Sequence, residues 1–103
     1  MYDVIVVGAR YAGSPTAMLL ARKGYRVLLV DAARLPSDTI STHSIWPPGV
    51  ACLKRWGLLD RVVATNCPVV RTISLDLGDF AISDELPPID GTADCYAPRR
   101  TVL

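Results

Sequence analysis

A glycine-rich turn between two short apolar runs constrains the fold of this chain more than any other feature. Residues 4–7 (VIVV) precede the turn, residues 8–13 (GARYAG) form it, and residues 27–30 (VLLV) follow a helical stretch and end at Asp31. A strand, a helix and a second parallel strand occur in this order in βαβ units. The pattern therefore predicts an α/β fold with a Rossmann-like βαβ core.

The predicted helix covers about residues 12–23. Its apolar or small side chains recur at helical spacing, at Ala12, Thr16, Leu19 and Leu20. Pro15 falls in the first turn, where a missing N–H costs little, and Gly24 suits the position just beyond the helix. The flanking runs, residues 3–7 and 26–30, do not alternate, which is typical of strands buried on both faces of a parallel sheet.

The remaining residues predict smaller elements. Residues 32–47 form an irregular polar connection that is long for a segment without a role. A short helix is expected from Pro48 to Gly57, and another helical turn or two in residues 58–65. Residues 69–77 alternate as one strand, Gly78-Asp79 predicts a type II′ turn, and residues 80–83 return as a β-hairpin excursion. Residues 86–94 are expected to form a loop, and residues 99–103 to begin a further element.

Length and composition exclude several classes of protein. The chain has 103 residues, enough for one small domain, and 11 basic against 10 acidic residues. No basic stripe is present, so nucleic acid is not an expected partner. No apolar run approaches the roughly 20 residues of a membrane span, and no signal peptide is visible. Three scattered cysteines without a C-x-x-C motif indicate free thiols and a cytoplasmic protein, with no metal site: Cys52, Cys67 and Cys95.

The turn and the second strand carry the candidate binding residues. A helix N-terminus that follows such a turn can bind a pyrophosphate, and a carboxylate after the second strand can bind a ribose. Asp31 follows Gly13 by 18 residues, close to the roughly 20 expected for the ribose acid. The candidates for cofactor binding in this region are Gly8, Arg10, Ala12, Gly13, Ser14 and Asp31.

Each of these residues also has a structural alternative. The glycines could serve only the turn, and Asp31 could be a solvated acid at a strand end. Arg10 stands where a second glycine normally lets the backbone approach the pyrophosphate; its guanidinium can reach a phosphate or remain at the surface. Ser14 could cap the helix or approach a phosphate.

Three segments together resemble a known family. They are residues 3–31, which hold the βαβ pattern, residues 36–60, with PSDT, STH, PGV and WGLLD, and residues 100–103 (RTVL), which are similar to the beginning of an R-x-x-L-D element. In this order the chain resembles the N-terminus of FAD-dependent oxidoreductases of the aromatic-hydroxylase type. Relatives of that type include para-hydroxybenzoate hydroxylase, flavin halogenases and geranylgeranyl reductases.

The resemblance implies FAD binding within a flavin-dependent monooxygenase or a related oxidoreductase. In that family NAD(P)H reduces the flavin, which then takes up O₂ and oxygenates a small molecule. The expected substrate is aromatic, polyketide-like or isoprenoid-like. The resemblance further implies that Thr42, His43 and Arg100 lie along the FAD, and it assigns no catalytic residue to this chain. Residues 1–103 would form the N-terminal part of an FAD-binding domain, with the substrate domain absent.

Two other interpretations stay open at this point. The βαβ pattern alone fits an NAD(P)-binding dehydrogenase domain equally well, although residues 37–60 favour FAD. The chain also stops at Leu103 without a cap, which is compatible with a truncated, non-catalytic fragment. His43 is the only histidine, and a lone histidine in a loop is more often structural than catalytic.

Overall fold

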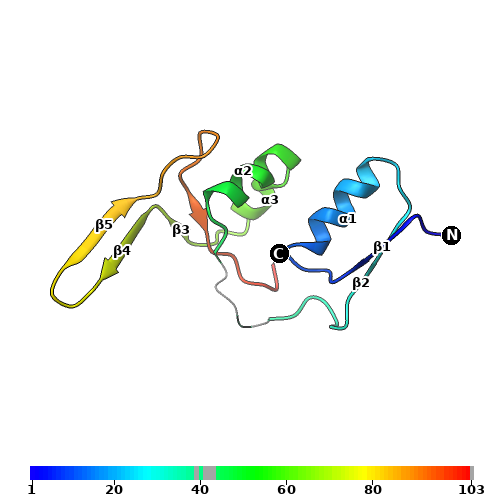
Figure 1. The fold of residues 1–103 in the computed structure, drawn as a ribbon, viewed down its shortest axis with the longest axis horizontal. Coiled ribbons are helices and arrows are strands. Elements are labelled where there is room, and N and C mark those ends of the chain that lie inside the picture. Colours follow the sequence, from blue (N-terminus) through cyan, green and yellow to red (C-terminus); the bar gives the residue numbers. More distant parts are fainter. Residues whose placement is uncertain (39, 41–43, 103) are drawn as a thin grey trace. The chain divides into compact units, whose positions relative to one another are not determined.

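The computed structural model describes residues 1–38, 40 and 44–102, which divide into two compact units, Met1–Leu35 and Pro36–Leu103 (Figure 1). The first unit contains β1 (Val4–Val7), α1 (Gly13–Arg22) and β2 (Val27–Val30). The second contains α2 (Pro47–Trp56), α3 (Leu59–Val63), β3 (Val69–Val70), β4 (Thr72–Asp76), β5 (Ala81–Glu85) and β6 (Cys95–Tyr96). Among the described residues, no helix has the length and apolar character needed to cross a bilayer.

The first unit is the predicted βαβ core. Strands β1 and β2 pair in parallel, from Val4 opposite Val27 to Val7 opposite Val30, and α1 packs against both. The helix ends where the sequence predicts. Gly24 has a φ of +92°, its N–H donates to the Ala21 carbonyl at 2.9 Å, and the Tyr25 N–H donates to the Leu20 carbonyl at 3.3 Å. These two bonds are a Schellman motif, which requires the left-handed conformation that glycine adopts without strain.

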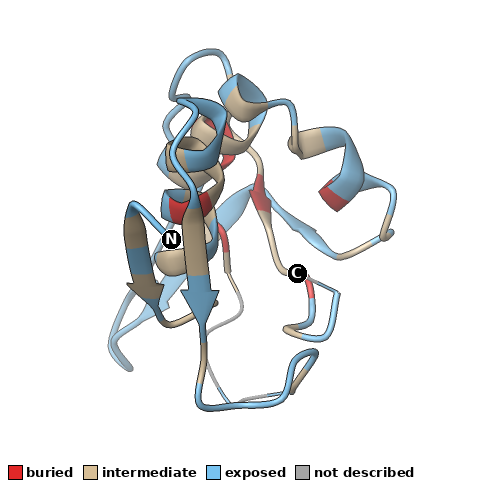
Figure 2. Ribbon diagram, turned by 90° about the vertical axis from the view of Figure 1, so that its right-hand side faces the viewer, coloured by how far each residue is buried: buried red, intermediate tan, exposed pale blue. Residues whose placement is uncertain are grey.

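The expected burial of this sheet on both faces is wrong for the described chain. Along β1, half-buried residues alternate with exposed ones, and Ile5 and Val7 keep 62% and 81% of their surface (Figure 2). The half-buried Val6 faces the helix, since its Cγ1 lies 3.4 Å from where a Cβ of Gly13 would be. One helix covers only one face of a two-stranded sheet, so the other face of β1 stays exposed.

The second unit has the larger set of buried side chains. Helix α2 begins at Pro47, one residue before the predicted start, and ends before Gly57, whose φ is +74°. It packs against α3 and β6. The buried residues described here are Ile45, Pro47, Val50, Ala51, Val62, Leu86, Cys95 and Pro98. All three cysteines are free thiols, as predicted.

The predicted strand 69–77 is two strands with different partners. Strand β3 pairs antiparallel with β6, with Val69 opposite Tyr96 and Val70 opposite Cys95, whereas β4 pairs with β5. A further bridge joins Ile45 to Tyr96. Strand β6 is only two residues long, and 24 residues, 71–94, separate it from β3, so no local sequence pattern predicts it. Residues 100–102 form a turn, where the sequence predicts the beginning of another element.

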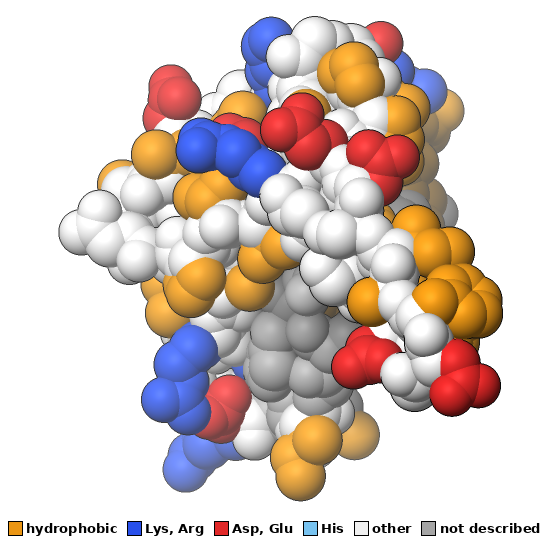
Figure 3. Space-filling view, turned by 90° about the vertical axis from the view of Figure 1, so that its left-hand side faces the viewer, with side chains coloured by type: hydrophobic (Ala, Val, Ile, Leu, Met, Phe, Trp, Pro, Cys, Tyr) orange, Lys and Arg blue, Asp and Glu red, His pale blue; other side chains and the backbone are white. Residues whose placement is uncertain are grey.

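The hairpin of β4 and β5 confirms the predicted turn at Gly78-Asp79, where the N–H of Asp79 donates to the carbonyl of Leu77 at 3.2 Å. Asp76 pairs with Ala81, and the turn holds Gly78 at a φ of +86° while Asp79 keeps a negative φ. The register places one apolar face on the hairpin, formed by Ile73, Leu75, Leu77, Phe80 and Ile82. Four of these side chains are more than half exposed. Figure 3, which views the molecule from the side of the hairpin, shows hydrophobic side chains at the surface beside acidic ones.

Candidate functional site

The turn between β1 and α1 begins at a glycine that no other residue replaces without strain. Gly8 has a φ of +102°, and its N–H donates to the carbonyl of Val30 at 2.7 Å. An added Cβ would meet no atom within 4 Å, so the requirement comes from the backbone conformation alone. The bond to Val30 ties the beginning of the turn to the end of β2.

The turn ends at a second glycine, and here the requirement is space. A Cβ on Gly13 would lie 1.5 Å from the carbonyl oxygen and 2.7 Å from the carbonyl carbon of Gly8. The first residue of α1 therefore packs directly against the backbone at the end of β1. This contact is the close helix-to-strand approach for which the last glycine of a G-x-G-x-x-G turn is needed.

The N-terminus of α1 is suited to an anion. Within residues 1–38, 40 and 44–102, the N–H groups of Ala12 and Gly13 have no hydrogen-bond acceptor, and no side chain caps the helix. The first turn contains no acidic residue. Unbonded N–H groups and the helix dipole leave a partial positive charge at this end. A phosphate group is a fitting acceptor for it.

Asp31 stands beside the turn as an ionised carboxylate. Its Oδ2 accepts the N–H of Ala9 at 2.7 Å, and its Oδ1 accepts the N–H of Ala33 at 2.7 Å. These two backbone bonds lower the pKa of Asp31, and the charge of Arg10 lowers it further. Each oxygen keeps a second lone pair, so the carboxylate can still accept hydrogen bonds from the two hydroxyls of a ribose.

Two further predicted residues belong to the same turn. The Oγ of Ser14 donates to the carbonyl of Ala9 at 2.7 Å, and the N–H of Ser14 donates to the carbonyl of Arg10 at 2.9 Å. Arg10 itself is half-buried. The first unit thus brings together six of the predicted site residues: Gly8, Arg10, Ala12, Gly13, Ser14 and Asp31.

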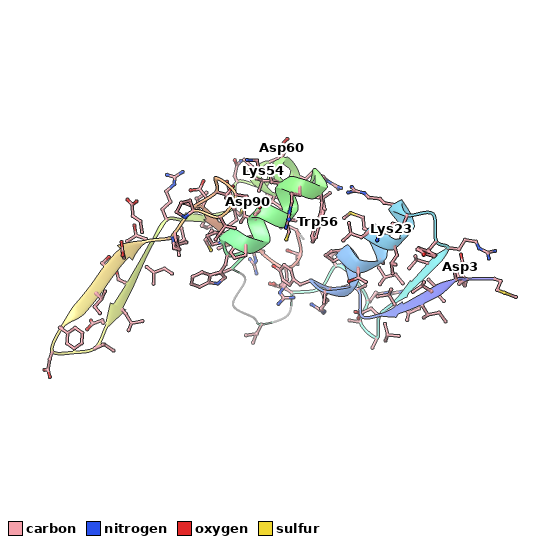
Figure 4. All side chains as sticks on the ribbon, turned by 45° about the horizontal axis from the view of Figure 1, so that its top comes forward. Asp3, Lys23, Lys54, Trp56, Asp60 and Asp90 are labelled. Carbon is pink, nitrogen blue, oxygen red and sulfur yellow. The ribbon has the colours of Figure 1, made fainter. Side chains whose placement is uncertain are left out.

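An ion pair links β1 and β2 at the end of the strands opposite the glycine turn. The carboxylate of Asp3 accepts from Nη2 of Arg26 at 2.9 Å, from its Nε at 3.1 Å and from its backbone N–H at 2.8 Å. Figure 4 shows Asp3 at the start of β1, at the end of the strand away from the glycine turn. This acid is therefore structural, whereas Asp31 stands at the turn.

The other predicted contacts are not all described. Thr42 and His43 lie outside the described residues. Arg100 lies in the second unit, is half-buried and belongs to the turn of residues 100–102. Its neighbour Arg99 forms an ion pair with Asp38.

Ala9 carries no functional signal in the sequence, yet both of its backbone polar groups are bonded in the structure. No signal in the residue type could have revealed this, because the contacts are made by the backbone. Among the residues that the structure describes, no group of three His, Cys, Asp or Glu side chains is arranged to hold a metal ion.

Comparison with known families decides between the interpretations left open by the βαβ core. A family model described as an FAD binding domain matches residues 1–84. This chain belongs to the family of FAD-binding domains. The geometry agrees with this membership, since the two glycines, the open N-terminus of α1 and the carboxylate of Asp31 fit the pyrophosphate and the ribose of FAD.

Curated relatives extend the similarity. The chain is 46% identical over 85 residues to menaquinone reductase from Mycolicibacterium smegmatis, an alignment that covers 82% of this chain and 20% of that protein. It is 39% identical over 62 residues to squalene monooxygenase from Eremothecium gossypii, covering 60% of this chain and 12% of that enzyme. The chain thus spans about a fifth or less of these relatives.

A solved structure supports the fold. The structure of pqsL, a probable FAD-dependent monooxygenase from Pseudomonas aeruginosa, superposes with a TM-score of 0.75 at 22% sequence identity. The superposition covers 98% of this chain and 27% of that one. The chain therefore has the fold of one part of such a protein, and the predicted α/β class with a βαβ core is confirmed.

Proposed function

We propose that the glycine turn, the N-terminus of α1 and Asp31 bind the ADP half of FAD. Gly8 and Gly13 admit the pyrophosphate to the N–H groups of Ala12 and Gly13, and the carboxylate of Asp31 accepts hydrogen bonds from the adenosine ribose. The observation that carries this proposal is the bond of 2.7 Å between Oδ2 of Asp31 and the N–H of Ala9. It holds an ionised carboxylate beside a helix end whose N–H groups are open to an anion.

The remaining predicted contacts complete the proposal. Arg10 adds a cation beside the pyrophosphate site, where a guanidinium can pair with a phosphate oxygen. Ser14 borders the same turn. Thr42, His43 and Arg100 are proposed to lie along the ribityl and flavin parts of FAD, on the strength of the family resemblance of their segments. Residues 1–103 would then be the N-terminal part of an FAD-binding domain.

For the complete protein we propose a flavin-dependent monooxygenase or related oxidoreductase, with NAD(P)H as co-substrate. The bound FAD would supply the redox chemistry. The residues of this chain bind and orient it, and none of them is assigned a proton transfer. The names of the relatives, menaquinone reductase and squalene monooxygenase, favour an isoprenoid-like small molecule over other aromatic or polyketide-like substrates. With three free thiols, we expect a cytoplasmic protein.

An Asp31→Asn variant tests the cofactor site. The amide cannot accept from both Ala9 and Ala33, and it lacks the charge that strengthens bonds to ribose hydroxyls. We expect the Kd for FAD, measured by quenching of flavin fluorescence, to rise about tenfold, the effect of losing one charge-assisted hydrogen bond. Asp60→Asn is the matched control, because Asp60 is an exposed acid on α3 (Figure 4) and its loss should leave the Kd unchanged.

Two results would contradict the proposal. One is an unaltered Kd for FAD in Asp31→Asn. The other is a wild-type chain that binds NADH more tightly than FAD, which would restore the dehydrogenase interpretation.

A further inference from the structure

Ala9 is held on both sides by side chains that come from different elements. Its N–H donates to Oδ2 of Asp31, just beyond β2, and its carbonyl accepts the hydroxyl of Ser14, in the first turn of α1. Both bonds are 2.7 Å long. With the N–H and the C=O of one residue both bonded, the two backbone dihedrals of Ala9 are restrained at the start of the turn.

The bond made by Ser14 limits what this residue can offer a cofactor. A serine hydroxyl has one proton to donate, and Ser14 donates it to the carbonyl of Ala9. Its oxygen then retains only acceptor lone pairs, which a negatively charged phosphate does not bind. The backbone N–H of Ser14 is also used, by the carbonyl of Arg10 at 2.9 Å. Both donors of Ser14 therefore serve the turn itself.

We propose that Ser14 is a positioning residue that acts together with Asp31 to fix the backbone of Ala9 before FAD arrives. The cofactor then meets a turn that is already ordered, and binding does not have to restrain residues 8–13. This inference rests on the proposed function for its effect on FAD. Its effect on the backbone of the protein without FAD does not depend on that function.

Amide hydrogen exchange of the chain without FAD, resolved by NMR, tests the positioning role directly. In Ser14→Ala the carbonyl of Ala9 loses its partner, and we expect the amide of Ala9 to exchange about tenfold faster. Ser14→Thr keeps the hydroxyl and should restore slow exchange. Thr16→Ala is the matched control, because the Oγ1 of Thr16 also donates at 2.7 Å to a backbone carbonyl, that of Ala12, from an exposed position on the same helix. It should leave Ala9 unchanged.

Titration with FAD separates positioning from direct contact. We expect Ser14→Ala to raise the Kd about fivefold, an effect within the range of one neutral hydrogen bond, with Ser14→Thr and Thr16→Ala close to wild type. A raised Kd with unchanged exchange at Ala9 would mean that Ser14 contacts the cofactor itself, and the proposal would be overturned while the FAD site stands.

The two proposals fail in different ways. If the wild-type chain binds no FAD, the proposed function fails, and the exchange rates alone still decide the role of Ser14. If the amide of Ala9 exchanges at the wild-type rate in Ser14→Ala, the positioning role is wrong whatever the FAD titration shows.

Discussion

Different interactions stabilise each of the two units of this chain. Among the described residues of Met1–Leu35, Ala17 is the single buried apolar side chain, and glycines and backbone hydrogen bonds define the turn. In Pro36–Leu103, buried side chains are more numerous, and short strands pair across long stretches of sequence. The candidate cofactor contacts of the first unit therefore depend on backbone geometry, which a single methyl group can disrupt. The second unit should tolerate comparable changes better.

The largest expected effect comes from adding a methyl group at the first residue of α1. In Gly13→Ala the new Cβ would overlap the carbonyl of Gly8, so α1 must move away from β1. We expect the first unit to lose about 3 kcal/mol or more of its free energy of unfolding, and FAD binding to be abolished. Urea unfolding followed by NMR signals of each unit measures the loss.

Gly49→Ala is the matched change in the second unit. Here the nearest atom is the Cγ2 of Ile45, at 3.0 Å, which is a side-chain atom that can shift. Alanine also favours the helical conformation by about 1 kcal/mol. We expect a net change of less than about 1 kcal/mol. A loss as large as that of Gly13→Ala would show that the two units do not differ in this way.

The second comparison uses two glycines with positive φ and open space around them. Gly8→Ala and Gly78→Ala should each cost about 1 to 2 kcal/mol, because both force an L-residue into the left-handed region. Their effects on FAD should differ. We expect Gly8→Ala to raise the Kd about tenfold or more and Gly78→Ala to leave it unchanged, because of the two only Gly8 belongs to the proposed binding turn. Paired unfolding and FAD titrations of both variants measure this difference.

Acid should weaken the first unit through two of its carboxylates. The bonds from Arg26 lower the pKa of Asp3, and the backbone bonds from Ala9 and Ala33 lower that of Asp31. Because each pKa is lower in the folded state, each group stabilises the fold above the unfolded-state value of about 3.9. This stabilisation is lost as the pH falls through the folded-state pKa.

The acid effect is measured by following the NMR signals of β1 and β2 from neutral pH to about pH 2. A double variant, Asp3→Asn with Asp31→Asn, should lack this contribution and show a flatter dependence of stability on pH. An equally steep dependence in the double variant would assign the acid sensitivity to other groups.

The smallest expected effects come from the exposed ion pairs of the two units. Arg99→Ala removes the pair with Asp38, whose partners are 76% and 41% exposed, and should change stability by less than about 1 kcal/mol. Arg26→Ala should have the larger effect of the two, because it removes two hydrogen bonds that the guanidinium of Arg26 donates to Asp3. Thermal unfolding at low and high salt measures the change in stability that each variant causes. Added salt should reduce the difference in stability between each variant and the wild type. Equal and salt-independent changes would contradict this ranking.

Much of the first unit could be predicted from the sequence, because its determinants are local. The glycine turn, the end of α1 just before Gly24 and the distance from Gly13 to Asp31 are all properties of neighbouring residues or of one βαβ unit. The position of the hairpin turn at Gly78-Asp79 was predictable for the same reason. Each depends on φ angles and caps that residue types restrict directly.

The pairing of β3 with β6, the bridge from Ile45 to Tyr96 and the exposure of Val7 were decided only in the tertiary structure. These features depend on which distant segment forms hydrogen bonds with a short strand and on how much of a sheet one helix covers. No local periodicity in the sequence encodes either of these. The same holds for Ala9. Its role comes from its backbone N–H and C=O, which every residue except proline possesses, so only the positions of Asp31 and Ser14 reveal it.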